Sequence, residues 1–173
     1  MDRFLSNTTN RVDKKGRVSI PAPFRSILGG QSTLHTILSV EHPVAEAGGP
    51  QYLAKLKARL QQMDPFSEEY EVWSFVLEGD SDELKIDPEG RILLSDNIRE
   101  HTGIENEVAF VGRGYFFQLW EPERFRAYRQ WARARAREMR RALGKASQQP
   151  NSLEIRAGYS PPDPEAGGEG QDT

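Results

Sequence analysis

The sequence RVDKKGRVSIP, residues 11–21, places a cluster of charged side chains and one glycine between two apolar fragments. Gly16 can adopt the positive φ angle that a short hairpin loop requires. After this glycine, apolar Val18 and Ile20 alternate with polar residues, as along a β-strand with one buried face. The stretch therefore predicts a charged hairpin turn that is followed by a short strand.

The same stretch occurs a second time in the chain. The sequence IDPEGRILLS, residues 86–95, matches VDKKGRVSIP, residues 12–21, at a constant offset of 74 positions, and the similarity continues beyond the motif. A repeat of this kind indicates a duplicated structural unit. We therefore expect a first unit over residues 5–50 and a second over residues 81–124. The identical pairs are Asp13/Asp87, Gly16/Gly90, Arg17/Arg91, Arg25/Arg99 and Gly29/Gly103.

The residues after each turn predict a short helix. In the first unit Pro21 suits a helix start, and the segment APFRSIL ends at Gly29. In the second unit Ser95 and Asp96 are candidate N-caps, and Gly103 is the expected stop. Each unit is thus expected to contain a strand, a turn, a second strand and a helix.

Further β-structure is predicted at the end of the second unit. The sequence NEVAFVGRGYFFQLW, residues 106–120, is rich in β-branched and aromatic residues. Gly112 and Gly114 bracket a hairpin turn within it. Together with the duplicated strands, this segment predicts an α+β fold that is mostly β.

Two longer helices are expected outside the repeated units. Residues 51–80 predict a helical connector, with apolar leucines at helical spacing. Residues 121–144 predict a long C-terminal helix that starts near Pro122 and stops at Gly144. Residues 145–173, rich in Gly, Pro, Ser and acidic residues, are expected to form a mobile acidic tail. The expected apolar positions are Leu53, Leu56 and Leu60 in the connector and Phe125, Tyr128, Ala132 and Met139 in the long helix.

The charge of the chain is unevenly distributed. The net charge of the whole chain is −3, but its N-terminal segment is basic: residues 1–30 carry six basic and two acidic residues, a net +4. Residues 144–173 carry two basic and five acidic residues, a net −3. Because local charge sets the field at a surface, an acidic average does not exclude a polyanionic partner.

The long helix carries eight arginines and three glutamates over residues 121–141, a net +5. Three interpretations remain open for it. It is a solvated helix, a helix that pairs with acidic surfaces of a neighbouring subunit, or a second DNA contact.

The residue types argue against several classes of function. The chain has no cysteine, and its three histidines show no metal-ligand spacing, so we expect no metal, no cofactor, no small-molecule substrate and no enzymatic activity. Asp13 and Asp87 could form a catalytic carboxylate pair, but Asp before a glycine turn is more often a turn-forming residue. The sequence shows neither a signal peptide nor an apolar segment long enough to span a membrane, and we expect a cytoplasmic protein.

The charged turns have two interpretations. In the simpler one, Arg17 and Arg91 are solvated strand residues. In the other, they contact DNA, because a hairpin with Lys and Arg can enter the major groove, where Arg reads guanine and Lys neutralises phosphate. The duplication favours the second, since two units packed about a pseudo-twofold axis could present both turns on one surface. The candidate DNA-binding residues are Lys14, Lys15, Arg17 and Arg91, with Gly16 and Gly90 as turn-forming residues.

Three segments carry a resemblance to a known family. The sequences VDKKGRVSIPAPFR, IDPEGRILLSDNIR and FVGRGYFFQLWEPERFRAY resemble those of the MraZ family of bacterial transcriptional regulators, over residues 3–143. The resemblance implies two tandem SpoVT-AbrB units that form a swapped-hairpin β-barrel. It also implies homo-oligomers, assembled as closed rings, that bind double-stranded DNA at repeated promoter boxes of the division and cell-wall gene cluster, including the family's own promoter. Such a regulator is cytoplasmic and associated with the nucleoid, and its DNA contacts correspond here to Arg17 and Arg91.

The second unit departs from the family pattern. It has Pro88 and Glu89 where the first unit has two lysines, and Ser95 where the family usually has Pro. Residues 12–28 carry four basic and one acidic residue, a net +3, whereas residues 86–102 carry two basic and four acidic residues, a net −2. We therefore expect the first turn to dominate DNA affinity. The alternative function is an oligomeric scaffold or interaction protein whose arginines serve subunit contacts.

Overall fold

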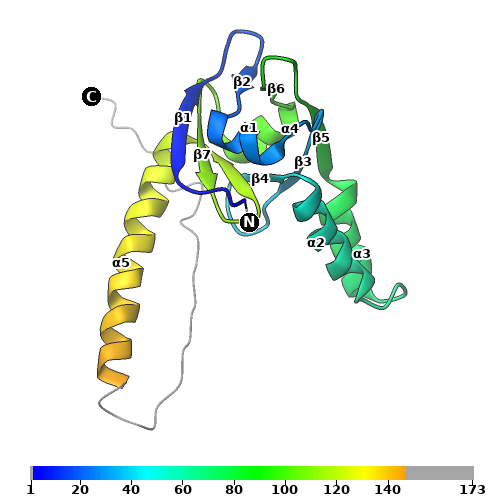
Figure 1. Ribbon diagram of the computed structural model, residues 1–173. Coiled ribbons are helices and arrows are strands. Elements are labelled where there is room, and N and C mark those ends of the chain that lie inside the picture. Colours follow the sequence, from blue (N-terminus) through cyan, green and yellow to red (C-terminus); the bar gives the residue numbers. More distant parts are fainter. Residues whose placement is uncertain (1, 147–173) are drawn as a thin grey trace, which may run out of the picture. The chain divides into compact units, whose positions relative to one another are not determined.

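The computed structural model describes residues 2–146, which adopt the expected α+β fold (Figure 1). The expectation that the fold is mostly β is wrong for these residues, because the helices, α5 above all, span more residues than the short strands. Apart from its first two residues, the mobile tail predicted over residues 145–173 lies outside the described residues. The strands are β1 (Asn7–Arg11), β2 (Arg17–Ser19), β3 (Thr33–Leu38), β4 (Ala45–Gly48), β5 (Ser81–Lys85), β6 (Arg91–Leu93), β7 (Glu107–Gly112) and β8 (Phe117–Trp120). The helices are α1 (Ala22–Leu28), α2 (Pro50–Gln61), α3 (Glu68–Ser74), the π-helix η1 (Phe75–Gly79), α4 (Asp96–Thr102) and α5 (Pro122–Ala146).

Six strands form one antiparallel sheet in the order β1-β7-β8-β4-β3-β5, and β2 and β6 form a separate two-stranded ribbon. The two repeats exchange strands within the sheet. Strand β1 of the first repeat pairs with β7 of the second, and β5 of the second pairs with β3 of the first. Since β1 and β5 are the edges of this sheet among the described strands, its hydrogen-bonded ladder does not close into the barrel that the resemblance implies.

The strands that flank the first turn do not form the simple hairpin that the sequence predicts. Only an isolated bridge joins Val12 to Val18, whereas β1 pairs with β7 and β2 pairs with β6. Val18 lies opposite Ile92 in the ribbon, and both side chains are buried. A three-residue strand cannot cover its own apolar face, so pairing between the repeats buries both faces at once.

The core is built jointly by both repeats. The rings of Phe4, Phe24 and Phe117 pack with centroid separations of 4.9 to 5.3 Å. Val18 and Ile92, on the inner face of the ribbon, belong to the same buried cluster. Burial of each such side chain is worth roughly 1.5–3 kcal/mol. The inner face of the ribbon is therefore anchored to the core by buried apolar contacts.

The predicted helix signals locate α1 and α4 correctly. Helix α1 follows Pro21, as expected. The Ser95 side chain caps α4 by accepting a hydrogen bond from the backbone N–H of Ile98 at 3.3 Å. Gly103 ends α4 with a φ of 73°. The two short helices that follow the turns thus begin where the sequence predicts.

The connector consists of α2, α3 and η1. Helix α2 is buried chiefly through Tyr52 and Leu60. Of the leucines expected there, Leu53 and Leu56 are only half-buried. The fully buried Tyr52 stacks on Phe116 with ring centroids 5.3 Å apart. The connector therefore covers the sheet with an aromatic contact that the leucine spacing alone did not predict.

Helix α5 belongs to a second compact unit that begins at Glu123, whereas the residues up to Pro122 form the first. Arg126 pairs with Glu123 at 2.6 Å, and Arg135 pairs with Glu138 at 2.8 Å. The helix continues past Gly144, where the sequence predicts its end, to Ala146. No helix among residues 2–146 combines the length and the apolar character that a membrane span requires.

Candidate nucleic-acid interface

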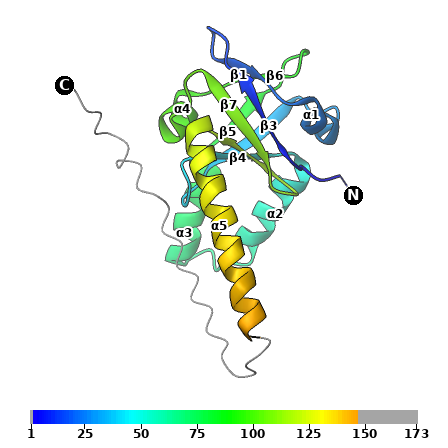
Figure 2. The same ribbon diagram turned by 90° about the vertical axis from the view of Figure 1, so that its left-hand side faces the viewer.

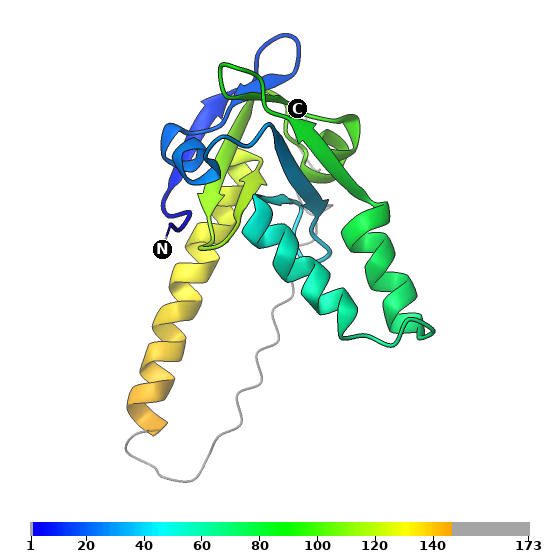
Figure 3. The same cartoon turned by 45° about the vertical axis from the view of Figure 1, so that its right-hand side comes forward.

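The two charged turns lie side by side at one end of the first compact unit. Figures 1, 2 and 3 show the loops before β2 and β6 projecting together from the same end. Pairing of β2 with β6 brings them together, because Arg17 lies opposite Leu93 and Ser19 lies opposite Arg91 in an antiparallel register. The duplicated stretches thus meet in one ribbon, although they are far apart in the sequence.

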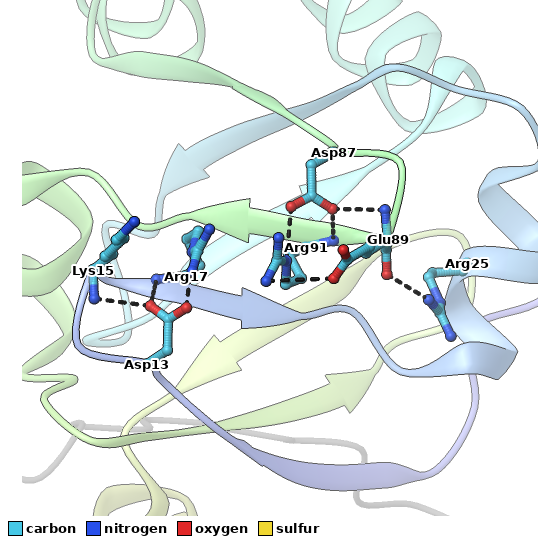
Figure 4. Close-up of polar contacts among 7 residues, drawn as sticks. All are labelled: Asp13, Lys15, Arg17, Arg25, Asp87, Glu89 and Arg91. Carbon is cyan, nitrogen blue, oxygen red and sulfur yellow. Dashed lines mark hydrogen bonds and ion pairs between the residues drawn. The ribbon is translucent and has the colours of Figure 1, made fainter.

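The first turn is organised by the carboxylate of Asp13 (Figure 4). Its Oδ1 accepts hydrogen bonds from the backbone N–H groups of Lys15 and Arg17, both at 2.9 Å. Its Oδ2 accepts from Nε of Arg17 at 2.8 Å. Gly16 closes the turn with a φ of 83° and donates its N–H to the carbonyl of Asp13 at 3.0 Å. Asp13 is therefore a turn-forming residue that also orients the Arg17 guanidinium.

The second turn repeats this arrangement. Asp87 accepts from the N–H groups of Glu89 and Arg91 at 2.9 Å each, and from Nε of Arg91 at 2.8 Å. Gly90 has a φ of 79°. The same separation of four positions from Asp to Arg thus produces the same local structure twice, as its short-range hydrogen bonds require.

These contacts shift the pKa values of the groups involved. The pKa of Asp13 is lowered, chiefly by the N–H of Arg17, and the pKa of Asp87 is lowered, chiefly by the N–H of Arg91. The pKa of the Arg91 guanidinium is raised, first by its hydrogen bond with Asp87 and to a lesser degree by nearby charges that include Asp13. The turns therefore hold charged carboxylates and charged guanidinium groups near neutral pH.

The ribbon has one apolar and one polar face. Val18 and Ile92 point into the core, whereas Arg17 and Arg91 lie diagonally across the opposite face. A two-stranded antiparallel ribbon has the width that the DNA major groove accommodates. With Nε held by Asp13, Arg17 keeps two terminal amino groups for other partners, whereas Nη1 of Arg91 already lies 3.4 Å from Oε2 of Glu89. The outer face can thus present two oriented arginines to base edges.

The two turns differ in the charge around their arginines. In the second turn, Oε2 of Glu89 lies 3.4 Å from Nη1 of Arg91. In the first turn the equivalent residue is Lys15, and both Lys14 and Lys15 are exposed. Among the described residues, the Arg17 guanidinium bonds only to Asp13. The first turn therefore presents a more accessible cluster of positive charge.

Each repeat also supports the turn of the other. Arg25 of α1 donates from Nη1 to the backbone carbonyl of Glu89 at 2.9 Å, and its side chain covers Gly90 (Figure 4). The N–H of Ile20 donates to the carbonyl of Gly90, and the N–H of Leu94 donates to the carbonyl of Gly16, both at 3.0 Å. The turns are therefore held by contacts between the repeats as well as by their own aspartates.

Known proteins were compared with the chain. A family model described as "MraZ protein, putative antitoxin-like" matches residues 78–144. "Transcriptional regulator MraZ" of Azorhizobium caulinodans is 44% identical over 155 residues, which cover 88% of this chain and 99% of that protein. The protein of the same name from Xanthobacter autotrophicus is 45% identical over 154 residues, or 88% of this chain and 98% of that one. The chain belongs to the MraZ family.

The similarity to MraZ proteins covers most of the chain. The family model covers the second turn and most of α5, whereas the relatives match most of the chain; "Transcriptional regulator MraZ" of Rhizobium meliloti, at 43% identity, covers 86% of it. The candidate residues of the ribbon were predicted from the sequence, whereas Arg25 was not predicted as a support. The signal was available, because Arg25 and Arg99 are an identical pair of the MraZ-type repeat.

Two further features of the described residues concern groups outside the ribbon. Within residues 2–146, no three His, Cys, Asp or Glu side chains are grouped as metal ligands. A cavity of about 310 Å³ is lined by Glu46, Tyr52 and Trp73, among others, and burial raises the pKa of Glu46. This cavity is formed by elements other than β2 and β6.

Proposed function

We propose that this chain is a sequence-specific, DNA-binding transcriptional regulator whose reading element is the β2–β6 ribbon. The observation that carries the proposal is the pair of outward-facing arginines, Arg17 and Arg91, each oriented by an aspartate through Nε at 2.8 Å. Orientation before binding reduces the entropy lost when a guanidinium engages a base. Lys14 and Lys15 are suited to phosphate contacts beside the first arginine.

The names of the relatives support this proposal. The proteins from Azorhizobium caulinodans and Xanthobacter autotrophicus are both named transcriptional regulators, and this chain covers almost their whole length. We propose that the targets are repeated boxes in the promoter of the chain's own gene and of the division and cell-wall cluster. The proposed location is therefore the cytoplasm, at the nucleoid.

The proposed active form is a homo-oligomer, assembled as a closed ring. Several ribbons joined in one assembly would bind repeated boxes with high effective concentration, which offsets the weak contacts of each turn. We also propose that residues 5–50 and 81–124 are two SpoVT-AbrB units that exchange hairpin strands. The pairing of β1 with β7 and of β5 with β3 across the repeats supports this arrangement.

A second candidate function is an oligomeric scaffold whose arginines serve subunit contacts. The arginine-rich helix α5 favours it, because these arginines lie outside the ribbon that we propose to read bases. Salt dependence separates the two functions. DNA binding through several Lys and Arg weakens steeply with salt, with a log-log slope of roughly −0.9 per phosphate neutralised.

The deciding experiment is a gel-shift titration with the duplex upstream of the chain's own gene. A scrambled duplex of equal length and the Arg17→Ala variant are the controls, and each titration is run at two salt concentrations. The regulator function predicts preferential binding to the natural duplex that the variant loses. Binding that ignores sequence and survives the substitution would assign the arginines to subunit contacts instead.

A further inference from the structure

The connector exposes large apolar side chains that the fold does not bury. Phe66 in the α2–α3 loop is 97% exposed, and Phe75 at the start of η1 is 60% exposed. Val72 of α3 is 50% exposed. Single exposed apolar residues are common, but three in one short segment indicate a binding surface.

These residues share a face with acidic side chains. Glu68 is three and four positions before Glu71 and Val72, and Phe75 is four and three positions after them, so the four residues lie along one side of the helix. The other side of the same segment, which includes Leu77, packs into the core cluster of the connector. We call the exposed side the connector face, defined by Glu68, Glu71, Val72 and Phe75.

The connector face is unsuited to DNA. Residues 64–80 carry six acidic and no basic side chains, a net −6, which repels phosphate. Helix α3 also lies at the end of the first compact unit away from the two turns (Figures 1 and 3). Its occupant should therefore be a basic surface that also carries apolar side chains.

The chain itself carries such a surface on the C-terminal half of α5. Residues 133–145 contain six basic residues and one acidic residue, a net +5. Met139 and Leu143, four residues apart, are 42% and 65% exposed. Four arginines lie in an adjacent row, and within residues 2–146 none of them has an ion pair. These are Arg133, Arg137, Arg140 and Arg141.

We propose that the connector face of one copy of this chain binds the C-terminal half of α5 of a second copy. Val72 and Phe75 would pack against Met139 and Leu143, and the glutamates of the connector face would pair with the arginine row. An exposed ion pair contributes little by itself, so the apolar contact supplies affinity and the charges select the partner and its orientation. Among the three interpretations of α5, this selects the subunit-contact helix.

The two halves of this contact are different surfaces, so the contact is heterologous. Each copy presents one connector face and one α5, and repetition of the contact generates a ring if the rotation closes. The inference rests on the homo-oligomer of the proposed function and names the surfaces that build it. It does not depend on DNA binding by the ribbon.

The test exchanges charges across the contact and measures molar mass by light scattering without DNA. One variant carries Glu68→Arg and Glu71→Arg, and the other carries Arg137→Glu and Arg140→Glu. We expect each variant alone to associate at least about tenfold more weakly than the wild type, because two attractive pairs become repulsive. Mixing the two variants should restore assembly, since each then offers the surface that the other lacks.

A matched control carries Glu83→Arg and Glu107→Arg, which change the same charge at exposed strand positions outside the connector; it should keep the wild-type mass. Wild-type mass in both charge-exchange variants, or no recovery on mixing, would overturn the inference. A monomeric wild type would overturn it together with the oligomeric part of the proposed function. None of these results concerns DNA reading, which the Arg17→Ala gel shift tests separately.

Discussion

Arg25 of the first repeat donates a hydrogen bond from Nη1 to the backbone carbonyl of Glu89 in the second repeat, at 2.9 Å. The contact spans 64 positions of sequence and fixes the turn that orients Arg91. It means that the charged surface is a property of the paired repeats and that neither turn is independent of the other unit.

Removal of this support should loosen the second turn. In Arg25→Ala we expect faster amide hydrogen exchange over residues 87–90, because the Glu89 carbonyl loses its partner and Gly90 loses its cover. Exchange over residues 13–16 serves as the internal control and should change less. Equal acceleration in both turns would mean that Arg25 stabilises the whole ribbon.

The two arginines should contribute unequally to DNA affinity. Loss of a two-hydrogen-bond contact to a base costs about 1–3 kcal/mol, so Arg17→Ala should weaken binding by roughly 5- to 150-fold. Arg91→Ala should weaken it by less, since Glu89 already neutralises part of that guanidinium's charge. Arg17→Lys keeps the positive charge but lacks the two-pronged guanidinium, so its DNA affinity should lie between those of the wild type and Arg17→Ala. Equal losses in the two alanine variants would refute the asymmetry.

Glu89 should limit the affinity of the second turn. Glu89→Lys restores the residue type that the first turn has at Lys15, and we expect tighter binding with a steeper salt dependence. One added phosphate contact would make the log-log slope more negative by roughly 0.9. Glu100→Lys, with the same change of charge on α4, is the control. If both variants tighten binding alike, net charge alone explains the gain.

The two turn glycines should differ in their tolerance of a side chain. Alanine at a positive φ costs about 1–2 kcal/mol, so Gly16→Ala should lower Tm by roughly 2–8 °C. Gly90→Ala should lower it further, because its Cβ would overlap the Arg25 side chain. Around Gly30 no atom lies within 4 Å of an added Cβ, so Gly30→Ala is the control for thermal melts. Equal losses at Gly16 and Gly90 would argue against the contact with Arg25.

The aspartates of the turns should link stability to pH. Both have a pKa below the ordinary 3.8, so their contribution to the free energy of unfolding is complete above that pH and is lost as the pH falls through the lowered values. Urea titrations should compare the wild type with Asp13→Asn/Asp87→Asn. The stability difference between them should shrink in acid below pH 3.8. A difference that does not change with pH would contradict this link.

Local residue patterns were sufficient to predict the turns. The spacing from Asp13 to Arg17 and from Asp87 to Arg91 encodes hydrogen bonds that span only a few residues, and Gly16 and Gly90 adopt the positive φ that such turns need. The helix starts after Pro21 and Ser95 are equally local. Duplication of the stretch also predicted that both turns could share one surface, as the pairing of β2 with β6 shows.

The partners of the strands could not be predicted in this way, because pairing is decided by which apolar faces cover one another over long distances in sequence. The residues around β1 carry no local signal that this strand pairs with β7. Likewise, the leucine spacing in α2 does not indicate that Tyr52 is one of its buried residues. The sequence by itself determined the chemistry and local shape of each turn. Only the tertiary structure decided that Val18 and Ile92 are buried against each other, which places Arg17 and Arg91 diagonally across one exposed face.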